Sequence, residues 1–328
     1  MRRKLSDVLA IFTCAIVSLL VVGSLAAQQS APSAQQKSFS TPKEAVSALI
    51  QAASSYDVAE LTAIFGPDGK DLVSSADPVQ SKNAATAFAA KASEKQEITP
   101  DPKHPNREIL SVGNDDWPMP IPLAKRADGK WYFDSKAGRN EVLLRRIGGN
   151  ELDAIQICRG YVEAQRKYAE EAHDGINQYA QKIISTPGKQ DGLYWVSADG
   201  TPGGPISEGI ARAIQEGYTK KGPYHGYYFK ILKGQGPAAH LGRLDYVIQG
   251  VMIGGFALIA APAEYRVTGV KTFIVNQDGV VYEKDLGPDT LNTAKGIELY
   301  NPDKTWHATN DQWEAGADDT AAAADTKP

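Results

Sequence analysis

Apolar side chains near residue 50 recur every three or four positions, the spacing of one buried helix face. Val46, Leu49, Ile50 and Ala53 form this stripe. The residues before it, T-P-K-E at 41–44, supply a capping threonine, a proline for the first turn and the glutamate of a capping box. The pattern therefore predicts an amphipathic helix that begins at residue 42.

A second start signal, D-V-A-E, follows at residues 57–60 and leads into an apolar stripe that Gly66-Pro67 ends. An alanine-rich stretch at about 79–93 predicts a third helix. The pattern then changes to short extended runs at 107–112, 121–125 and 131–133. Asp128-Gly129 lies between the last two runs and is a strong signal for a hairpin turn. The first part of the chain is predicted to place helices against a sheet.

The remainder of the chain begins with a predicted short helix at 140–146, which Gly148-Gly149 is expected to interrupt. A long helix is predicted over about 150–172, because apolar residues from Leu152 to Ala172 recur at helical spacing, and Asp174-Gly175 is expected to end it. A turn-rich segment and a short helix at 207–217 follow. Five strands are then predicted, at 227–232, 244–248, 255–260, 271–275 and 280–284.

The Pro-spaced run W-P-M-P-I-P at 117–122 allows two interpretations. It can form an edge strand whose prolines prevent further pairing. It can also bind a partner in an extended, polyproline-like conformation.

Three basic residues, an apolar run from about 8 to 22 and small residues at 24–26 open the chain. This is the pattern of a cleavable secretory signal, so residues 1–26 are predicted to be removed and the mature protein to be periplasmic or secreted. Residues 27–38 are predicted to be a disordered leader, and the Asp/Ala-rich residues 311–328 a disordered tail.

Cleavage would change the net charge from −4 to −6, because three basic residues and one acidic residue leave. A mildly acidic surface argues against nucleic acid as a partner. No later apolar run reaches the length of a membrane span, so none is expected after cleavage. Cys14 lies within the signal, which leaves Cys158 without an intrachain disulfide partner.

Two local resemblances suggest an α+β fold of two small domains. Residues 39–136 resemble a nuclear-transport-factor-2-like (cystatin-like) domain of helices on a curved sheet. This rests on S-T-P-K-E-A-V, Tyr56-Asp57 and D-G-K-W-Y-F. Residues 137–310 resemble the soluble part of pilin-like domains, a long helix followed by an antiparallel meander, with no prepilin cleavage site before Glu151. The matching strings begin at 151, 226, 260 and 273.

Longer strings resemble the bacterial family known as domain of unknown function 2950, over nearly all of the chain after the signal. They are G-P-D-G-K-D-L at 66–72, I-S-T-P-G-K-Q-D-G-L-Y-W at 184–195, H-G-Y-Y-F-K-I-L at 225–232, G-Q-G-P-A-A at 234–239, M-I-G-G-F-A-L at 252–258 and V-N-Q-D-G-V-V-Y-E-K-D-L-G-P-D-T at 275–290. The resemblance implies no activity, cofactor or site residue.

His225, Tyr227 and Tyr228 form the most suggestive cluster for ligand binding. A histidine titrates near neutral pH, and tyrosine hydroxyls can hydrogen-bond a ligand. The competing interpretation is that these residues begin a strand and that their aromatic rings belong to the core. Side chains alternate along a strand, so Tyr227 and Tyr228 would point to opposite faces.

Other catalytic and metal-binding patterns are missing from the sequence. Cys158 falls on the apolar stripe of the predicted long helix, where a thiol behaves as a small apolar group. No catalytic residue, metal site or cofactor is therefore predicted. The histidines lie at positions 104, 173, 225, 240 and 307. No two of them have the spacing of zinc ligands.

Two classes of function remain. The first is a non-catalytic binding or assembly module that contacts an envelope protein or polymer of unknown identity. The second is a small-ligand-binding protein or hydrolase that uses the hollow of the first domain or the groove between the domains. The missing catalytic residue types favour the first class.

Overall fold

The structure is a computed structural model, and it describes residues 36–216, 218–219 and 221–310. The predicted signal peptide, most of the predicted leader and the predicted tail lie outside these residues. The described residues belong to one compact unit. They form helices and several antiparallel sheets, which confirms the α+β class.

Helices occupy the first sixty described residues, and their starts confirm the predicted capping. At the first helix, α1, the Thr41 side chain accepts a hydrogen bond from the Glu44 backbone N–H, and the Glu44 carboxylate accepts one from Ser40 N–H at 3.0 Å. These two bonds form a variant of the capping box, in which the glutamate bonds the N–H of the residue before the N-cap. The helices are α1 (Pro42–Ser55), α2 (Val58–Phe65), the 3-10 turn η1 (Pro67–Gly69), α3 (Lys70–Val73) and α4 (Pro78–Glu94).

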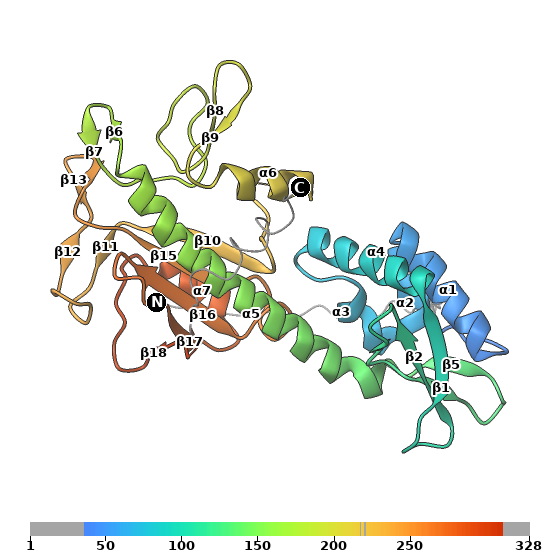
Figure 1. Ribbon diagram of the computed structural model, residues 1–328. Helices are drawn as coiled ribbons and strands as arrows, with labels where there is room; N and C mark the ends of the chain where they lie inside the picture. The colour runs from blue at the N-terminus through green and yellow to red at the C-terminus, as the bar shows by residue number, and fades with distance from the viewer. Residues whose placement is uncertain (1–35, 217, 220, 311–328) are drawn as a thin grey trace, which may run out of the picture. The chain divides into compact units, whose positions relative to one another are not determined.

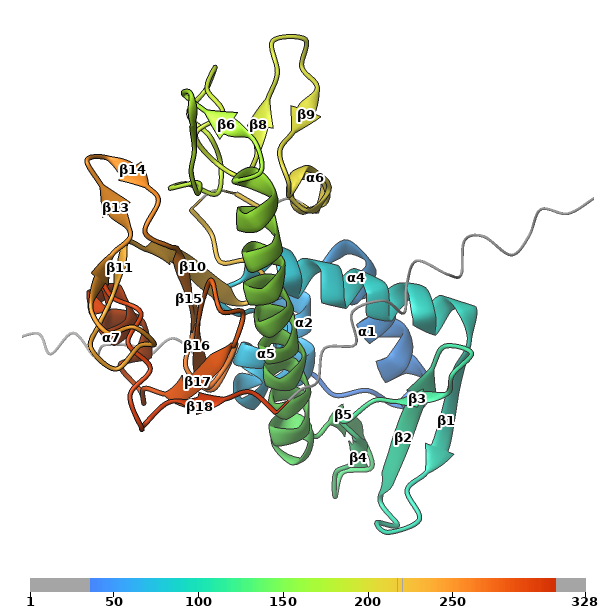
Figure 2. The same cartoon turned by 60° about the vertical axis from the view of Figure 1, so that its left-hand side comes forward.

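The first sheet follows directly and is antiparallel, in the order β1-β2-β4-β5, with β3 paired to β2 (Figure 2). The Pro-spaced run thus contributes a short strand, β3. Strand β1 is not among the predicted strands. The bounds are β1 (Gln96–Pro100), β2 (Arg107–Val112), β3 (Trp117–Pro118), β4 (Leu123–Lys125) and β5 (Trp131–Phe133).

One uninterrupted helix, α5 (Ser135–Tyr168), replaces the two helices expected on either side of Gly148-Gly149. The expected break was wrong. Packing on both sides of the glycines outweighs their low helix propensity, since α5 contacts η1 and α3 at one end and β15 and β16 at the other. The helix ends at Tyr168 rather than at 172, and Asp174-Gly175 instead forms the turn of a small hairpin, β6 (Ala172–His173) with β7 (Ile176–Asn177).

The second sheet is antiparallel in the order β10-β15-β16-β17-β18, and α5 lies across β15 and β16 (Figure 1). The predicted strand at 244–248 divides in two and pairs outside this sheet, because β12 pairs with β11 and β13 with β14. The sheet strands are β10 (Tyr227–Leu232), β15 (Ala257–Pro262), β16 (Lys271–Asn276), β17 (Tyr282–Asp285) and β18 (His307–Ala308).

Short elements connect these strands. They are β8 (Trp195–Val196), β9 (Pro202–Gly203), α6 (Ser207–Gln215), β11 (Gly234–Gln235), β12 (Leu244–Asp245), β13 (Val247–Ile248), β14 (Val251–Met252) and α7 (Thr290–Gly296). Within the described residues, no helix has both the length and the apolar composition needed to span a bilayer.

Buried apolar side chains form two separate clusters. One joins α1, α2 and α4 to the first sheet and includes Leu49, Ile64 and Phe133. The other joins α5 to the second sheet and includes Cys158 and Phe273. The predicted division of the chain at residues 136/137 falls inside α5, near its beginning.

The end of the predicted leader packs against the first cluster. The Gln36 side chain donates hydrogen bonds to the carbonyl oxygens of Ile64 at 3.0 Å and Phe133 at 2.7 Å. Lys37 forms an ion pair with Glu60. Residues 36–38 are therefore part of the fold.

Candidate functional site

The structure separates the three residues that the sequence singled out. Tyr227 is fully buried beside Phe273, and its hydroxyl donates a hydrogen bond to the Lys271 carbonyl at 2.9 Å. Burial raises the pKa of Tyr227 well above its ordinary value. Tyr228 lies on the other face of β10 and is 36% exposed. Only His225, just before the strand, contacts a titratable partner.

His225 lies next to a carboxylate on α5. Its Nδ1 is 2.6 Å from Asp153 Oδ2, and its backbone has the left-handed φ of 49°. The ring of Tyr218 stacks on the imidazole at 5.9 Å between centroids, and Tyr224 meets it edge-on at 4.4 Å. The hydrogen bond to Asp153 raises the pKa of His225, although burial opposes this shift.

Next to this pair, a buried aspartate joins the start of α4 to the residue before β10. The Asp77 carboxylate accepts hydrogen bonds from the backbone N–H groups of Gln80 and Gly226, both at 2.9 Å. Asn150 of α5 completes the junction: its Oδ1 accepts from Gln80 Nε2 at 2.6 Å and its Nδ2 donates to the Thr268 carbonyl at 2.8 Å. This polar junction fixes α4, α5 and the segment before β10 to one another.

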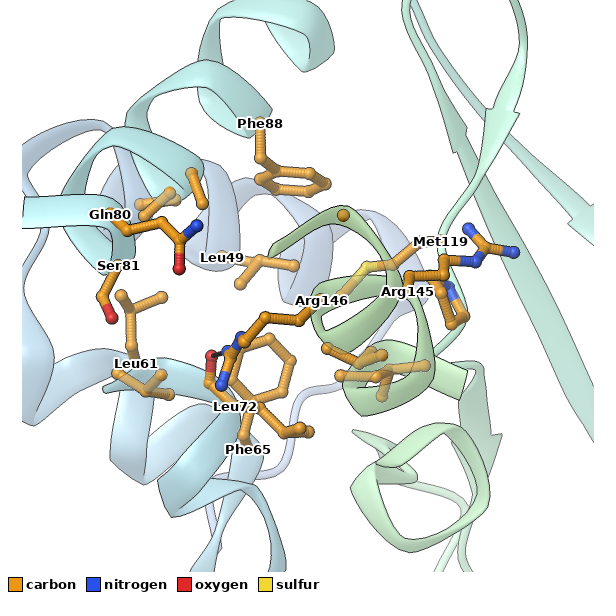
Figure 3. Close-up of a pocket in the computed structure, with 18 of the residues that line it drawn as sticks. Leu49, Leu61, Phe65, Leu72, Gln80, Ser81, Phe88, Met119, Arg145 and Arg146 are labelled. Atoms are coloured by element: carbon orange, nitrogen blue, oxygen red, sulfur yellow. Dashed lines mark hydrogen bonds between the residues drawn. The ribbon is translucent and has the colours of Figure 1, made fainter. Parts of the chain in front are cut away.

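The junction lies at one edge of a cavity of about 420 Å³. The walls are mostly apolar and come from α1, α2, α3, α4, β3 with the residues just after it, and α5. Figure 3 shows Phe65, Leu72 and Leu49 around the hollow, with Phe88 on the far side. The α5 wall is one helical stripe, made of Val142, Arg145, Arg146, Gly149, Asn150 and Asp153.

Arg146 brings a positive charge into this apolar cavity (Figure 3). Its Nη1 donates to the Asp71 carbonyl at 2.7 Å and its Nη2 to the Leu72 carbonyl at 2.9 Å, so the guanidinium lies at the end of α3. Burial lowers the pKa of Arg146, while the charges of Asp71 and Glu264 act in the opposite direction. Within the described residues no carboxylate comes within ion-pair distance of it, and Asp71 pairs with Arg139 instead.

A guanidinium carries five N–H donors. Arg146 directs one bond from each of two nitrogens to a carbonyl. Donors therefore remain for a further acceptor. The neighbouring Arg145 is engaged elsewhere, since its Nε donates to Glu141 at 2.7 Å and its guanidinium lies 5.2 Å from the Trp117 ring centroid. Arg146 is thus the positive group that the cavity can offer to a ligand.

Other chemistry is sparse in the described part of the chain. No group of three or more histidine, cysteine or acidic side chains there could hold a metal ion. Cys158 is fully buried, and burial raises the pKa of its thiol to about 12, so the thiolate is scarce at neutral pH.

The residues that shape the cavity are not among those that the sequence singled out. Arg146, Asn150 and Asp153 recur at i, i+4 and i+7, the spacing of one helix face. That signal becomes visible only if the helix is read through Gly148-Gly149. Asp77 carries a signal of its own, since D-P at a helix start is typical of a capping residue.

The fold and the cavity define an α+β protein with an apolar hollow, one guanidinium inside it and a histidine–aspartate pair at its edge. Residues 36–309 match the sequence model of the family described as "Protein of unknown function (DUF2950)", and the chain belongs to this family. No curated protein and no solved structure matches the chain significantly. The cystatin-like and pilin-like resemblances of the two parts therefore stay predictions.

Proposed function

We propose that this is an exported binding protein whose cavity holds a small molecule with an apolar body and one anionic group. The observation that carries the proposal is the Arg146 guanidinium, which enters an apolar cavity without a carboxylate partner among the described residues. A charge removed from water is costly unless it is paired. A bound carboxylate or phosphate would supply the missing pair, and its planar or tetrahedral oxygens suit the guanidinium fork.

The dimensions of the cavity support the same proposal. A hollow of about 420 Å³ lies within the range of ordinary small-molecule sites, which are mostly apolar and contain a few placed polar groups. Backbone carbonyls hold Arg146 in place before any ligand arrives. Such a preset donor loses little side-chain entropy on binding.

Binding is favoured over hydrolysis by the surroundings of His225. Its side-chain partners are the Asp153 carboxylate and two tyrosine rings. No serine, threonine or cysteine side chain of the described residues is hydrogen-bonded to it. A histidine–aspartate pair activates a nucleophile only when a hydroxyl or thiol lies within reach.

Export is proposed from the amino-terminal sequence, and intact-mass analysis of periplasmic and secreted fractions tests it. The expected mass lacks residues 1–26 or close to that. Recovery of the chain with Met1 in a cytoplasmic pool would contradict export without affecting the cavity.

Ligand binding is tested by calorimetry on the mature protein, with decanoate as the anionic probe and decanol as its neutral counterpart. Decanoate is expected to bind more tightly, because a charge-assisted hydrogen bond is worth about 1.5–3 kcal/mol. Arg146→Gln should remove this preference and leave decanol binding nearly unchanged. Equal affinity for the two probes, or a preference that survives in Arg146→Gln, would refute the role of Arg146.

Two adjacent glycines provide a matched pair for the location of the site. Gly149 lines the cavity and Gly148 does not, yet a Cβ added at either position meets no atom within 4 Å. Gly149→Leu should fill the cavity and abolish decanoate binding, whereas Gly148→Leu should bind normally. Unfolding curves of both variants verify the fold, and tight binding in folded Gly149→Leu would place the ligand elsewhere.

A further inference from the structure

A second cavity, of about 640 Å³, lies at the carboxyl end of α5 and has a different character. Its walls come from the β6–β7 hairpin, from residues 178–182 and 188–191, and from Lys233 and Gly250. Polar side chains predominate, in contrast to the apolar cavity that contains Arg146. The chemistry of a ligand for this second cavity must therefore be different.

Hydrogen bonds between distant segments hold the second cavity open in a defined shape. The Tyr168 hydroxyl donates to the Gln190 carbonyl at 2.6 Å, which fixes the loop to α5. Gln181 Nε2 donates to the Gly250 carbonyl at 2.7 Å, which ties in the β13–β14 hairpin. A site whose walls are fixed in advance loses less entropy when a ligand binds.

An ion pair strengthens the same loop. Lys182 Nζ lies 2.7 Å from both Asp191 Oδ2 and Thr186 Oγ1, and the Thr186 backbone N–H donates to the other Asp191 oxygen at 2.7 Å. Burial works against ionisation of Asp191, but the hydrogen bonds from Lys182 and Thr186 lower its pKa to about 2. Asp191 is therefore charged at neutral pH and neutralises Lys182.

Several polar groups of the cavity have no partner among the described residues. Gln178 Nε2 donates to the His173 carbonyl and Gln181 Nε2 to that of Gly250, so the two amide oxygens remain free as acceptors. The ammonium groups of Lys189 and Lys233 form no ion pair within the described residues. The cavity therefore offers both amide oxygens as acceptors and ammonium groups as positively charged donors.

Aromatic rings lie against the polar groups. Tyr168 and His173 stack face to face at 3.6 Å, and Trp195 meets His173 edge-on at 6.3 Å. Tyr179 also lines the cavity and is partly exposed. Of these rings, Tyr168, His173 and Tyr179 line the cavity and give it an apolar side against which the carbon face of a ring-shaped ligand can pack.

We propose that this second cavity binds an acidic saccharide, a sugar ring that carries a carboxylate. Hydroxyl groups of the sugar would donate to the amide oxygens of Gln178 and Gln181, and its carboxylate would accept from Lys189 and Lys233. A simple inorganic anion fits less well, because it has no carbon face to pack against the aromatic rings of the cavity. A neutral sugar would make no charge-assisted hydrogen bond to the two ammonium groups.

Saturation-transfer NMR and calorimetry on the mature protein test the proposal, with glucuronate, digalacturonate, glucose and inorganic phosphate as ligands. The two sugar acids are expected to bind at least about tenfold more tightly than glucose and phosphate, the effect of one charge-assisted hydrogen bond. Lys189→Gln and Lys233→Gln should each weaken sugar-acid binding about tenfold. Lys43→Gln, which removes an exposed lysine of α1, should have no effect and serves as the control.

Three results would overturn the saccharide assignment: no binding of either sugar acid, phosphate binding as tightly as glucuronate, or undiminished binding in both lysine variants. The Gly149→Leu variant keeps this test separate from the first cavity. Sugar acids should bind it normally, so that the two sites can fail independently.

Discussion

Replacing two glycines of α5 by alanine is expected to change the free energy of unfolding in opposite directions. Gly138 is buried near the start of the helix, and Gly148 is exposed near its middle. A Cβ at Gly138 would lie 2.5 Å from the Pro120 carbonyl oxygen and 2.6 Å from Ile121 Cα. A Cβ at Gly148 would meet no atom within 4 Å.

The expected magnitudes follow from these surroundings. Alanine favours a helix interior over glycine by about 0.8–1.0 kcal/mol, so Gly148→Ala should stabilise the protein by roughly that amount. Gly138→Ala gains the same helix propensity. Its added Cβ must, however, displace backbone atoms, which cannot rotate away as a side chain can. Overpacking of this kind costs about 1–3 kcal/mol, and the upper end applies here. The net loss should be about 2 kcal/mol.

Urea unfolding of the purified variants at one protein concentration measures both changes. For a chain of this size, each kcal/mol also shifts Tm by about 1.5–2 °C, because the unfolding entropy grows with chain length. Gly160→Ala, another exposed position of α5 with open space around it, should repeat the Gly148 result. Destabilisation by Gly148→Ala would contradict the continuity of α5 at the paired glycines. A neutral Gly138→Ala would contradict the close approach of the 120–121 backbone.

Three further perturbations test other features. The pKa of His225 is raised in the folded state by Asp153, so their pair stabilises the protein fully below about pH 6.5 and less as pH rises through the raised value. Asp153→Asn should therefore lose more unfolding free energy at pH 5.5 than at pH 9 in urea titrations, and equal losses would contradict the coupling. Asp77→Ala should cost about 1–3 kcal/mol by leaving the buried Gly226 N–H unpaired, with faster hydrogen exchange at that amide; an unchanged exchange rate would argue against the bond. Cys158 should resist iodoacetamide at pH 8 until denaturant is added, as mass spectrometry would show, and rapid labelling of the native protein would place the thiol at the surface.

The sequence predicts elements best where apolar residues repeat on one face. Helices α1 and α2 each bury such a face, strand β16 is buried on both faces, and the predicted positions of these elements and of β10 are confirmed. Strand β1 escaped prediction because its residues, Q-E-I-T-P, bury no complete face and are ordered by pairing with β2 at the sheet edge. The paired glycines of α5 predicted a break that is absent, since tertiary contacts determine whether a weak helical segment stays helical.

The cavity was less predictable than the fold. Its lining combines residues from six segments between positions 49 and 153, and their convergence depends on how α5 packs beside η1 and α3. His225 was identified from its residue type, but its partner Asp153 is 72 positions away. Local sequence patterns carry no information on contacts between residues so far apart in the chain. A prediction of the Arg146–Asp153 stripe would have required the correct helix boundaries first.

Helix α5 restricts how the length of this chain can change during evolution. Residues near its start pack in the first apolar cluster and residues from Ala154 onward pack in the second. Each added residue rotates everything after it by about 100° around the helix axis. A single insertion at position 151 would turn Cys158 and Val162 out of their cluster while Arg146 stayed in place. Natural variants should therefore carry length changes in the loops, and any change within α5 should be close to whole helical turns.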